Sequence, residues 1–227
     1  MTFAHSGYSG RILYFDREGR EWGRESFSAT VHSQGRTLRA LCEMDEAQLH
    51  REVTWSLDTD WTPRDGFVRL TRGGSTIATC WYLVNGTEAQ CEGVTQEHGR
   101  ISRSVTADQA IRFLGTHPLT GDSVIASARG TENPGVEQAV TSAVNSLAHL
   151  GDEGLDVRIL EPLVAFIGFE TIEVAAGRFD ARRYTIRWSD TMPHVTDFWV
   201  HGEDCLPLLS IVPALGERYE MVEFTRY

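Results

Sequence analysis

Length, composition and charge limit what this chain can be. Its 227 residues are 41% hydrophobic and 10% aromatic, which is ordinary for a folded globule and enough for a sizeable core. The formal net charge is −11, from 32 acidic against 21 basic residues. Such an acidic surface opposes docking on phosphate backbones or anionic lipid, so we expect no nucleic-acid partner.

The sequence also predicts a soluble cytoplasmic protein. No stretch approaches the roughly 20 apolar residues that cross a bilayer, so we expect no membrane span. Residues 1–10 have no basic start and no long apolar run, which predicts that a secretory signal is absent.

Short strands separated by turn residues fill the first half of the chain. Turn signals recur roughly every 8–12 residues, a spacing typical of an antiparallel meander rather than of βαβ units. The predicted strands cover residues 11–15, 26–32, 37–42, 53–57, 67–70, 76–84, 87–95 and 101–105.

The Asn85-Gly86 dipeptide is the strongest hairpin signal in this half. A two-residue loop there would pair Val84 with Thr87 and place Cys80 opposite Cys91. A disulfide between these two is geometrically conceivable, but buried free thiols are the favoured interpretation. The four cysteines form no C-x-x-C pair, and we expect no metal site.

The middle of the chain departs from the meander. Residues 108–114 could form a helical turn or two, 115–122 read as a loop, and 123–128 resume as a strand. Beyond Asn133, apolar residues recur at helical intervals up to residue 147. A helix over 135–150 is therefore slightly favoured. The alternative is an irregular crossing loop, because Val, Thr, Ser and Asn are middling helix formers.

The β pattern returns after residue 164. Alternation predicts a hairpin over 168–188 with a turn at Ala175-Ala176-Gly177, followed by strands at 195–201, 206–212 and 219–227. We therefore predict a mainly β protein. It would be one domain over 1–227, a large antiparallel meander forming a curled sheet or barrel, with a short helical or irregular insertion near 108–150.

The C-terminal third resembles a group of bacterial β proteins of unknown function, the DUF3108-like proteins. The resemblance is carried by Gly168-Phe-Glu-Thr-Ile-Glu-Val-Ala-Ala-Gly-Arg-Phe179 and by Phe198-Trp-Val-His-Gly-Glu-Asp-Cys-Leu-Pro-Leu208. It implies a curved antiparallel sheet related to the LolA/LppX lipoprotein carriers. It implies no catalytic residues, and Ala175 stands where the group usually has proline.

Aromatic residues are the candidate ligand contacts. A curled sheet leaves a concave face that can hold one apolar molecule, and indole and phenol rings suit such contact. Tyr82, Tyr184, Ile186 and Trp188 are expected on the inward face, whereas Trp81 is expected on the opposite one. The predicted ligand-binding residues are Trp55, Trp61, Tyr82, Tyr184, Trp188, Trp199 and His194. For any one aromatic, simple core packing is the more frequent role.

Histidines and carboxylates are the candidate catalytic groups. His117 and His149 both lie in the atypical middle segment, where loop histidines could act as acid–base residues. Asp58 and Asp60 form a carboxylate pair at a strand end, although an ordinary Asx turn is the commoner reason for such a pair.

The sequence leaves three functions open. The first is a protein that binds an apolar or aromatic small molecule, such as a lipid, a steroid or an aromatic metabolite, in the curl of the sheet. The second is a cofactor-independent lyase, isomerase or hydrolase in the same cavity, and the third is a structural protein with a filled barrel. We expect no cofactor, and a homodimer is conceivable.

Overall fold

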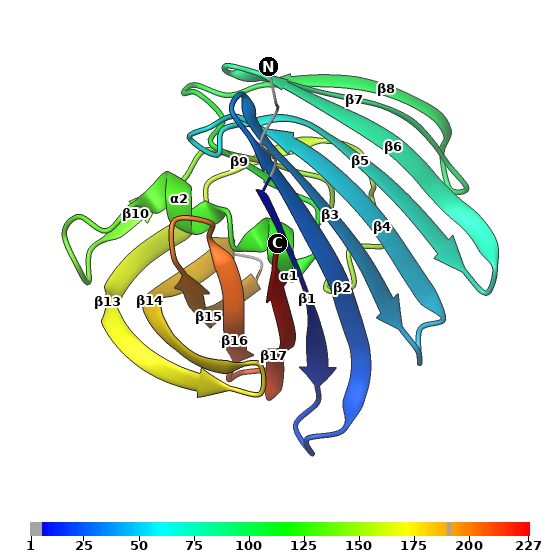
Figure 1. Cartoon of the computed structure of the whole chain (residues 1–227). Coiled ribbons are helices and arrows are strands. Elements are labelled where there is room, and N and C mark those ends of the chain that lie inside the picture. Colours follow the sequence, from blue (N-terminus) through cyan, green and yellow to red (C-terminus); the bar gives the residue numbers. More distant parts are fainter. Residues whose placement is uncertain (1–5, 190–191) are drawn as a thin grey trace.

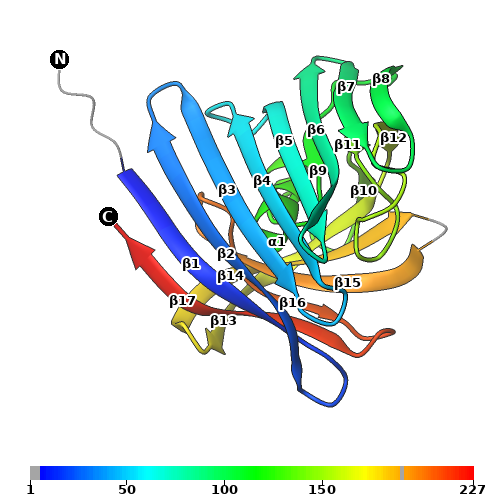
Figure 2. The ribbon, with the colours of Figure 1, turned by 90° about the vertical axis from the view of Figure 1, so that its right-hand side faces the viewer.

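The computed structural model describes residues 6–189 and 192–227. Residues 1–5, part of the segment in which we predicted no export signal, lie outside the described residues. The model forms one 14-stranded antiparallel sheet that curls on itself (Figures 1 and 2). The predicted mainly β, curled-sheet architecture is confirmed.

The sheet is built from two meanders that meet where β1 pairs with β17. The strand order is β10-β13-β14-β15-β16-β17-β1-β2-β3-β4-β5-β6-β7-β8, so β10 and β8 are its edges. The N-terminal meander comprises β1 (Ser6–Phe15), β2 (Glu21–His32), β3 (Gly35–Met44), β4 (Leu49–Leu57), β5 (Pro63–Arg72), β6 (Ser75–Asn85), β7 (Glu88–Thr95) and β8 (Gly99–Thr106). The C-terminal meander comprises β13 (Leu163–Val174), β14 (Gly177–Ser189), β15 (Met192–His201), β16 (Leu206–Val212) and β17 (Glu217–Arg226).

Residues 107–162 connect the two meanders and fill the concave side of the curl. The described part of this segment contains two short helices, α1 (Leu119–Asp122) and α2 (Ile125–Arg129), and the edge strand β10 (Glu137–Ala139). A small separate sheet has the order β12-β11-β9, from β9 (Phe113–Gly115), β11 (Ser142–Val144) and β12 (Arg158–Leu160). Figure 1 shows α1 inside the curl, and both sheets contribute to one hydrophobic core.

The helix predicted over 135–150 is wrong. Residues 142–144 instead form β11, which pairs in parallel with β9 and antiparallel with β12. Val140 and Ala143 are buried in the core. Because the helix propensity of this segment is weak, the sheet partners decide its conformation.

The conformations predicted for 108–114 and for 123–128 are also wrong. Residues 113–115 form β9, and the Arg112 amide donates to the Thr141 carbonyl at 2.8 Å. Residues 119–129 were predicted as loop and strand, but they contain the helices α1 and α2. The first amides of α1 are bound by a side chain of β2, a contact that local sequence does not reveal.

The register predicted for the Asn85-Gly86 hairpin is wrong, because the two-residue loop begins one residue later than predicted. Asn85 pairs with Glu88, so the loop consists of Gly86 and Thr87, and Tyr82 rather than Cys80 stands opposite Cys91. The carbonyls of Gly86 and Thr87 accept hydrogen bonds from the Ile111 and Ala107 amides. This docking onto the middle segment favours the shifted turn. The four cysteines are buried free thiols, as favoured from the sequence.

The hairpin at 168–188 is confirmed as β13 and β14, which pair from Leu163↔Arg187 to Val174↔Gly177. Tyr184 and Ile186 face inward as predicted. Trp81 lies on the outer face with 45% of its surface exposed, also as predicted. Within the described residues, no helix has the length and apolar character needed to cross a membrane.

Candidate functional site

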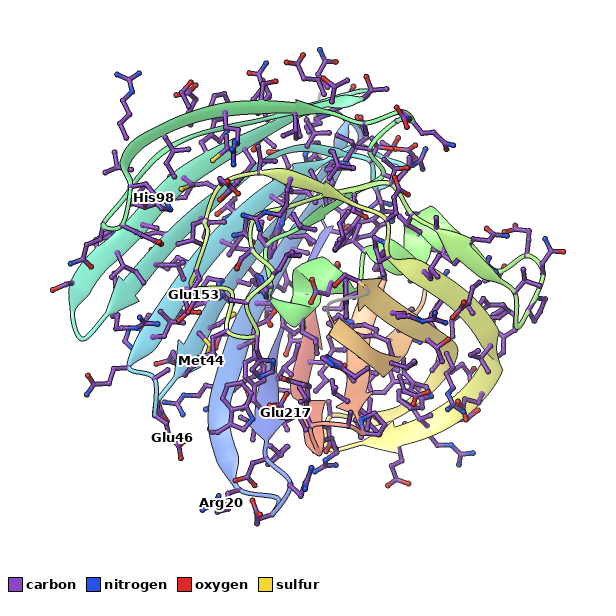
Figure 3. All side chains as sticks on the ribbon, turned by 180° about the vertical axis from the view of Figure 1, so that it is seen from behind. Arg20, Met44, Glu46, His98, Glu153 and Glu217 are labelled. Carbon is purple, nitrogen blue, oxygen red and sulfur yellow. The ribbon has the colours of Figure 1, made fainter. Side chains whose placement is uncertain are left out.

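A cavity of about 150 Å³ remains between the concave face of the sheet and the middle segment. Its apolar and aromatic wall includes Tyr14, Trp22, Met44, Leu119, Val144, Leu160, Trp188, Phe198, Val212 and Tyr219. Its polar lining includes Arg51, His117, Asp122, Ser146, His149, His194, Thr196 and Ser210. Figure 3 shows the curl from behind, with α1 inside it.

Aromatic rings pack edge to face along one side of the cavity. The ring centroids of Tyr14 and Tyr219 are 4.9 Å apart, and those of Trp22 and Tyr219 are 6.1 Å apart. Both pairs have the T-shaped geometry that aromatic quadrupoles favour. Trp188 packs from another side against Phe113 at 6.1 Å. The cavity is therefore bounded by flat, rigid surfaces suited to a ring-shaped or apolar guest.

Glu25 anchors the middle segment to the sheet. Its carboxylate is fully buried and accepts hydrogen bonds from the Leu119 amide at 2.7 Å, the Thr120 amide at 3.0 Å and the Tyr14 hydroxyl at 2.9 Å. Burial raises the pKa of Glu25, and these hydrogen bonds oppose the shift because they favour the charged form. The contact fixes the start of α1 and thereby positions Asp122 at the cavity.

Asp122, at the last position of α1, is a protonated acid at neutral pH. Burial, reinforced by the negative charge of Glu25, raises the pKa of Asp122 to about 8, although the Arg51 guanidinium opposes the shift. A carboxyl group in this state can donate a hydrogen bond into the cavity.

His117 is held in a strained backbone conformation beside the cavity. Its φ of 78° is in the left-handed region, which is unfavourable for a residue with a Cβ atom. The imidazole packs against Gly151, where a Cβ atom would lie 2.3 Å from His117 Cδ2 and 2.6 Å from Arg51 Nη2. Burial and the nearby Arg51 charge lower the pKa of His117 to about 3, so the ring is neutral at pH 7.

Arg51 is a buried cation that lines the cavity. It occupies an inward position of β4, between Leu49 and Val53, and only 3% of its surface is exposed. Its guanidinium donates to the Leu150 carbonyl, while its buried Nε atom has no hydrogen-bond partner. No ion pair to Arg51 exists among the described residues. Such an uncompensated buried charge is rare in folded proteins.

His149 and Glu217 join the middle segment to β17 at the rim of the cavity. His149 Nε2 lies 3.0 Å from Glu217 Oε1, and the Tyr219 hydroxyl donates to the same carboxylate at 2.5 Å. The hydrogen bond to Glu217 raises the pKa of His149. Burial acts to raise the pKa of Glu217, but the hydrogen bonds from His149 and Tyr219 outweigh it and lower that pKa.

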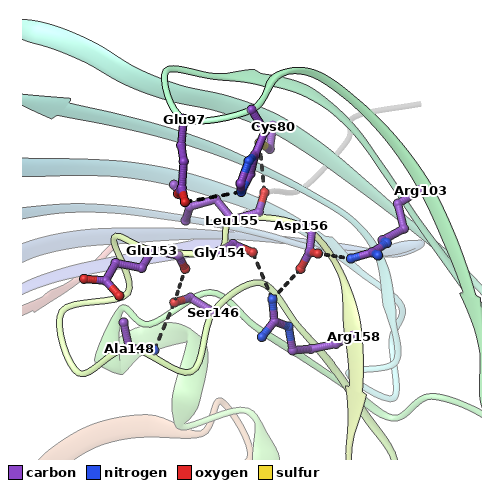
Figure 4. A network of polar contacts seen from close by, with 11 residues as sticks. Cys80, Glu97, Arg103, Ser146, Ala148, Glu153, Gly154, Leu155, Asp156 and Arg158 are labelled. Carbon is purple, nitrogen blue, oxygen red and sulfur yellow. Dashed lines mark hydrogen bonds and ion pairs between the residues drawn. The ribbon is translucent and has the colours of Figure 1, made fainter.

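The loop of residues 145–157 covers the cavity and is held by polar contacts (Figure 4). The Ser146 hydroxyl donates to the Glu153 carbonyl at 2.6 Å and accepts from the Ala148 amide at 3.1 Å. Asp156 forms ion pairs with Arg103 of β8 and Arg158 of β12. The Ser146 contacts close the loop on itself, and the Asp156 ion pairs tie its C-terminal end to β8 and β12. Residues 146–150 of this loop line the cavity.

The structure brings together four of the predicted site residues. His117, His149, Trp188 and His194 all line the cavity. The other predicted ligand contacts lie elsewhere: Trp55, Tyr82 and Tyr184 are fully buried in the core, and the buried indoles of Trp61 and Trp199 bond to the Glu203 carbonyl and the Glu170 carboxylate.

Asp58 and Asp60 are not part of the cavity lining. Asp58 forms an ion pair with Arg64, and Asp60 accepts from the Thr62 amide at 3.1 Å, as in an ordinary Asx turn. Their carboxylates are partly exposed to solvent. The structure therefore does not bring this pair to the histidines.

The residues predicted from the sequence do not include Glu25, Arg51, Asp122 and Trp22. Glu25 and Arg51 share the inward phase of their strands with Phe27 and Val53, so each is a charged residue at a core position. The strands predicted from residues 26 and 53 exclude them, whereas strands that start a few residues earlier include both. Trp22 is in the opposite phase of β2, next to the register shift between Tyr14↔Gly23 and Phe15↔Glu21, so alternation does not predict it at the cavity. Asp122 carries no local signal.

Comparisons with known proteins support the fold and no particular activity. No protein-family model matches the chain, and no curated protein matches its sequence. A β-barrel-like protein of the domain of unknown function DUF1849 from Brucella abortus is similar in structure, with a TM-score of 0.57 and 12% identity over 99% of this chain and 98% of that one. A DUF1089 family protein from Pseudomonas aeruginosa has a TM-score of 0.53 and 11% identity over 84% and 90%.

These likenesses agree with the prediction of a curved β fold shared with bacterial proteins of unknown function. At such low identity they show the fold alone, so the chemistry must be argued from the cavity. Within residues 6–189 and 192–227, no group of three or more His, Cys, Asp or Glu side chains could hold a metal ion.

Proposed function

We propose that this protein binds a small aromatic or apolar molecule in the cavity between the sheet and the middle segment. The observation that supports this most directly is the cavity of about 150 Å³, with aromatic walls and several polar groups at its lining. Ligand sites are typically apolar concavities with a few placed polar groups. A structural protein with a filled barrel would leave no such space.

The cavity volume narrows the class of molecule. Cavities of about 150 Å³ hold a molecule the size of benzene. A single aromatic ring or a short alkyl chain therefore fits, whereas a complete steroid does not. Longer molecules would have to extend through the rim near His149 and Glu217.

Tryptophan fluorescence tests this proposal, because Trp22 and Trp188 both contribute to the wall. Titration with small aromatic compounds and short-chain fatty acids is expected to change the emission saturably. A Ser210→Leu variant should abolish the change by filling the cavity, since Ser210 is buried and lines it. The matched control is Ser56→Leu, which places the same side chain on the outer face of β4, away from the cavity. A wild-type protein whose emission no compound perturbs would refute the proposal.

A second candidate function is acid–base catalysis in the same cavity. The observation favouring it is that Asp122 and His117, both in the lining, have pKa values displaced in opposite directions, to about 8 and about 3. Such divergence is typical of sites that pair an acid with a base. A ring with a pKa of about 3 accepts a proton poorly, however, so binding is the first proposal. Loss of turnover in both Asp122→Asn and His117→Gln, on a substrate identified by binding, would support catalysis.

We also propose that the resemblance of the 168–179 hairpin to the DUF3108-like proteins reflects a shared curved sheet. The well-formed β13–β14 hairpin supports this relation. A solved structure of a DUF3108-like protein with a different strand order would contradict it.

A further inference from the structure

We propose that the molecule bound in this cavity carries a carboxylate, which the buried Arg51 guanidinium receives, so that the ligand class is a small aromatic or short-chain carboxylic acid. This inference rests on the proposed binding function and names the chemistry of its ligand.

Arg51 has hydrogen-bonding capacity that the described residues do not fill. A guanidinium has several N–H donors in a planar fork that matches a carboxylate. Here one donor is used by the Leu150 carbonyl, and the Nε atom is buried without a partner. Because the Nε atom is closed off from the cavity, a ligand oxygen would bind the Nη donors that the Leu150 carbonyl leaves free.

Arg51 also lacks a counter-ion among the described residues. Buried cations in folded proteins are normally paired with an anion, yet Arg51 makes no ion pair with any described carboxylate. Glu25 is in the same row of the sheet, but Cys42 lies between them in the register, and the oxygens of Glu25 are already occupied by Leu119, Thr120 and Tyr14. Asp122 lines the same cavity, but its pKa of about 8 keeps it protonated at pH 7. An anion bound in the cavity would therefore supply the charge that these residues do not.

The neighbouring groups are compatible with an incoming anion. Asp122 is protonated and His117 is neutral at pH 7, so neither adds negative charge. The His117 ring and Arg51 Nη2 converge at Gly151, both within 2.6 Å of the point where a Gly151 Cβ would stand. The guanidinium therefore lies beside a neutral ring rather than beside an ionised carboxylate.

The lining combines one buried cation with aromatic side chains. Arg51 lines the same cavity as Trp22, Trp188 and Phe198. This combination suits an amphipathic molecule with one charged end and one apolar body.

The test compares 3-phenylpropanoate with 3-phenylpropan-1-ol, two probes of nearly equal shape that differ in charge, by calorimetric titration at pH 7. The wild-type protein should bind the acid at least about tenfold more tightly than the alcohol, because a charge-assisted hydrogen bond to guanidinium is strong. Arg51→Met should lower the affinity for the acid by about tenfold to a hundredfold and leave the affinity for the alcohol nearly unchanged. Arg39→Met, which removes one exposed arginine from β3, should retain the preference for the acid.

The outcomes separate this inference from the function on which it rests. If the alcohol binds the wild-type protein as tightly as the acid, the carboxylate inference is overturned while the binding function stands. If neither probe nor any other small compound binds, both are overturned. The comparison of the two probes on the wild-type protein decides the question even if Arg51→Met does not fold.

Discussion

Glu25 and Arg51 face the interior in one row of the sheet, separated by Cys42, and form no ion pair with each other. Neighbouring strands are about 4.8 Å apart, so the two backbones are separated by roughly 10 Å. Glu25 binds the middle segment through the first amides of α1, and Arg51 binds it through the Leu150 carbonyl. Glu25 and Arg51 therefore hold two separate parts of the middle segment, residues 119–120 and residue 150, against the sheet.

Glu25→Gln is expected to destabilise the protein by about 2–4 kcal/mol, because a buried acceptor of three hydrogen bonds would be replaced by a group that also carries donors. Urea-induced unfolding measures the change. The matched control is Glu52→Gln, an exposed carboxylate on β4, for which we expect less than about 0.5 kcal/mol. Equal effects of the two substitutions would show that Glu25 does not anchor α1.

Asp122 should make the protein less stable as the pH rises. Its pKa is about 8 in the folded state and near 3.8 when unfolded, so the folded state holds the proton more tightly. The stabilisation is complete below about pH 4 and is lost as the pH rises towards 8, by at most about 1.4 kcal/mol per pH unit. Asp122→Asn cannot ionise, so the free energy of unfolding of the wild type minus that of the variant isolates this contribution. A difference that does not vary between pH 5 and pH 8 would contradict the raised pKa.

The His149–Glu217 pair should stabilise the folded state most at intermediate pH, between the pKa values of the two groups. The raised pKa of His149 means that its contribution is present at low pH and is lost as the pH rises through that value. The lowered pKa of Glu217 means that its contribution is lost as the pH falls. Because His149 is about half exposed, we expect the pair to contribute less than about 1 kcal/mol.

An NMR titration of the histidines checks the assignment of this pair. Glu217→Gln should lower the pKa of His149, because the hydrogen bond and the nearby negative charge would be lost. Glu223→Gln, on the same strand but paired with Arg11, should leave it unchanged. An unaltered His149 titration in Glu217→Gln would exclude the contact.

Gly151→Ala should be among the most damaging single substitutions. Gly151 has a φ of 61°, and an added Cβ would collide with the His117 ring and with Arg51. We expect a loss of more than about 3 kcal/mol together with loss of probe binding. Gly74→Ala is the matched control, because Gly74 also has a positive φ but no atom within 4 Å of the added Cβ. It should cost about 1 kcal/mol. Similar costs for the two would show that backbone conformation alone, and not the close packing at His117, requires Gly151.

Alternation along the chain was sufficient to predict the sheet. Strands such as β13 and β14 carry a two-residue period because one face packs on the core and the other meets solvent, and this constraint acts within each strand. The same period marks Arg51 as a charge at a core position, a signal that is present in the sequence once the strand is extended to residue 49.

The conformation of the middle segment was decided by the tertiary structure. Residues 119–129 are helical, and residues 142–144 are a strand, because each is bound by elements distant in sequence: Glu25 for the former, β9 and β12 for the latter. Their own helix and strand propensities are too weak to select one state. The turn of the β6–β7 hairpin lies one residue later than predicted for the same reason, because the middle segment binds the carbonyls of Gly86 and Thr87.

Side-chain direction along a strand follows from local geometry, so the amino-acid sequence alone specifies a large β sheet with one inward and one outward face. Which polar residues meet in the cavity depends on the tertiary structure. His117 and His149 were predicted as candidates, but their neighbours Arg51, Asp122 and Glu217 come from β4, α1 and β17. A cavity is formed where segments distant in sequence fail to fill the space between them, and that depends on packing in three dimensions.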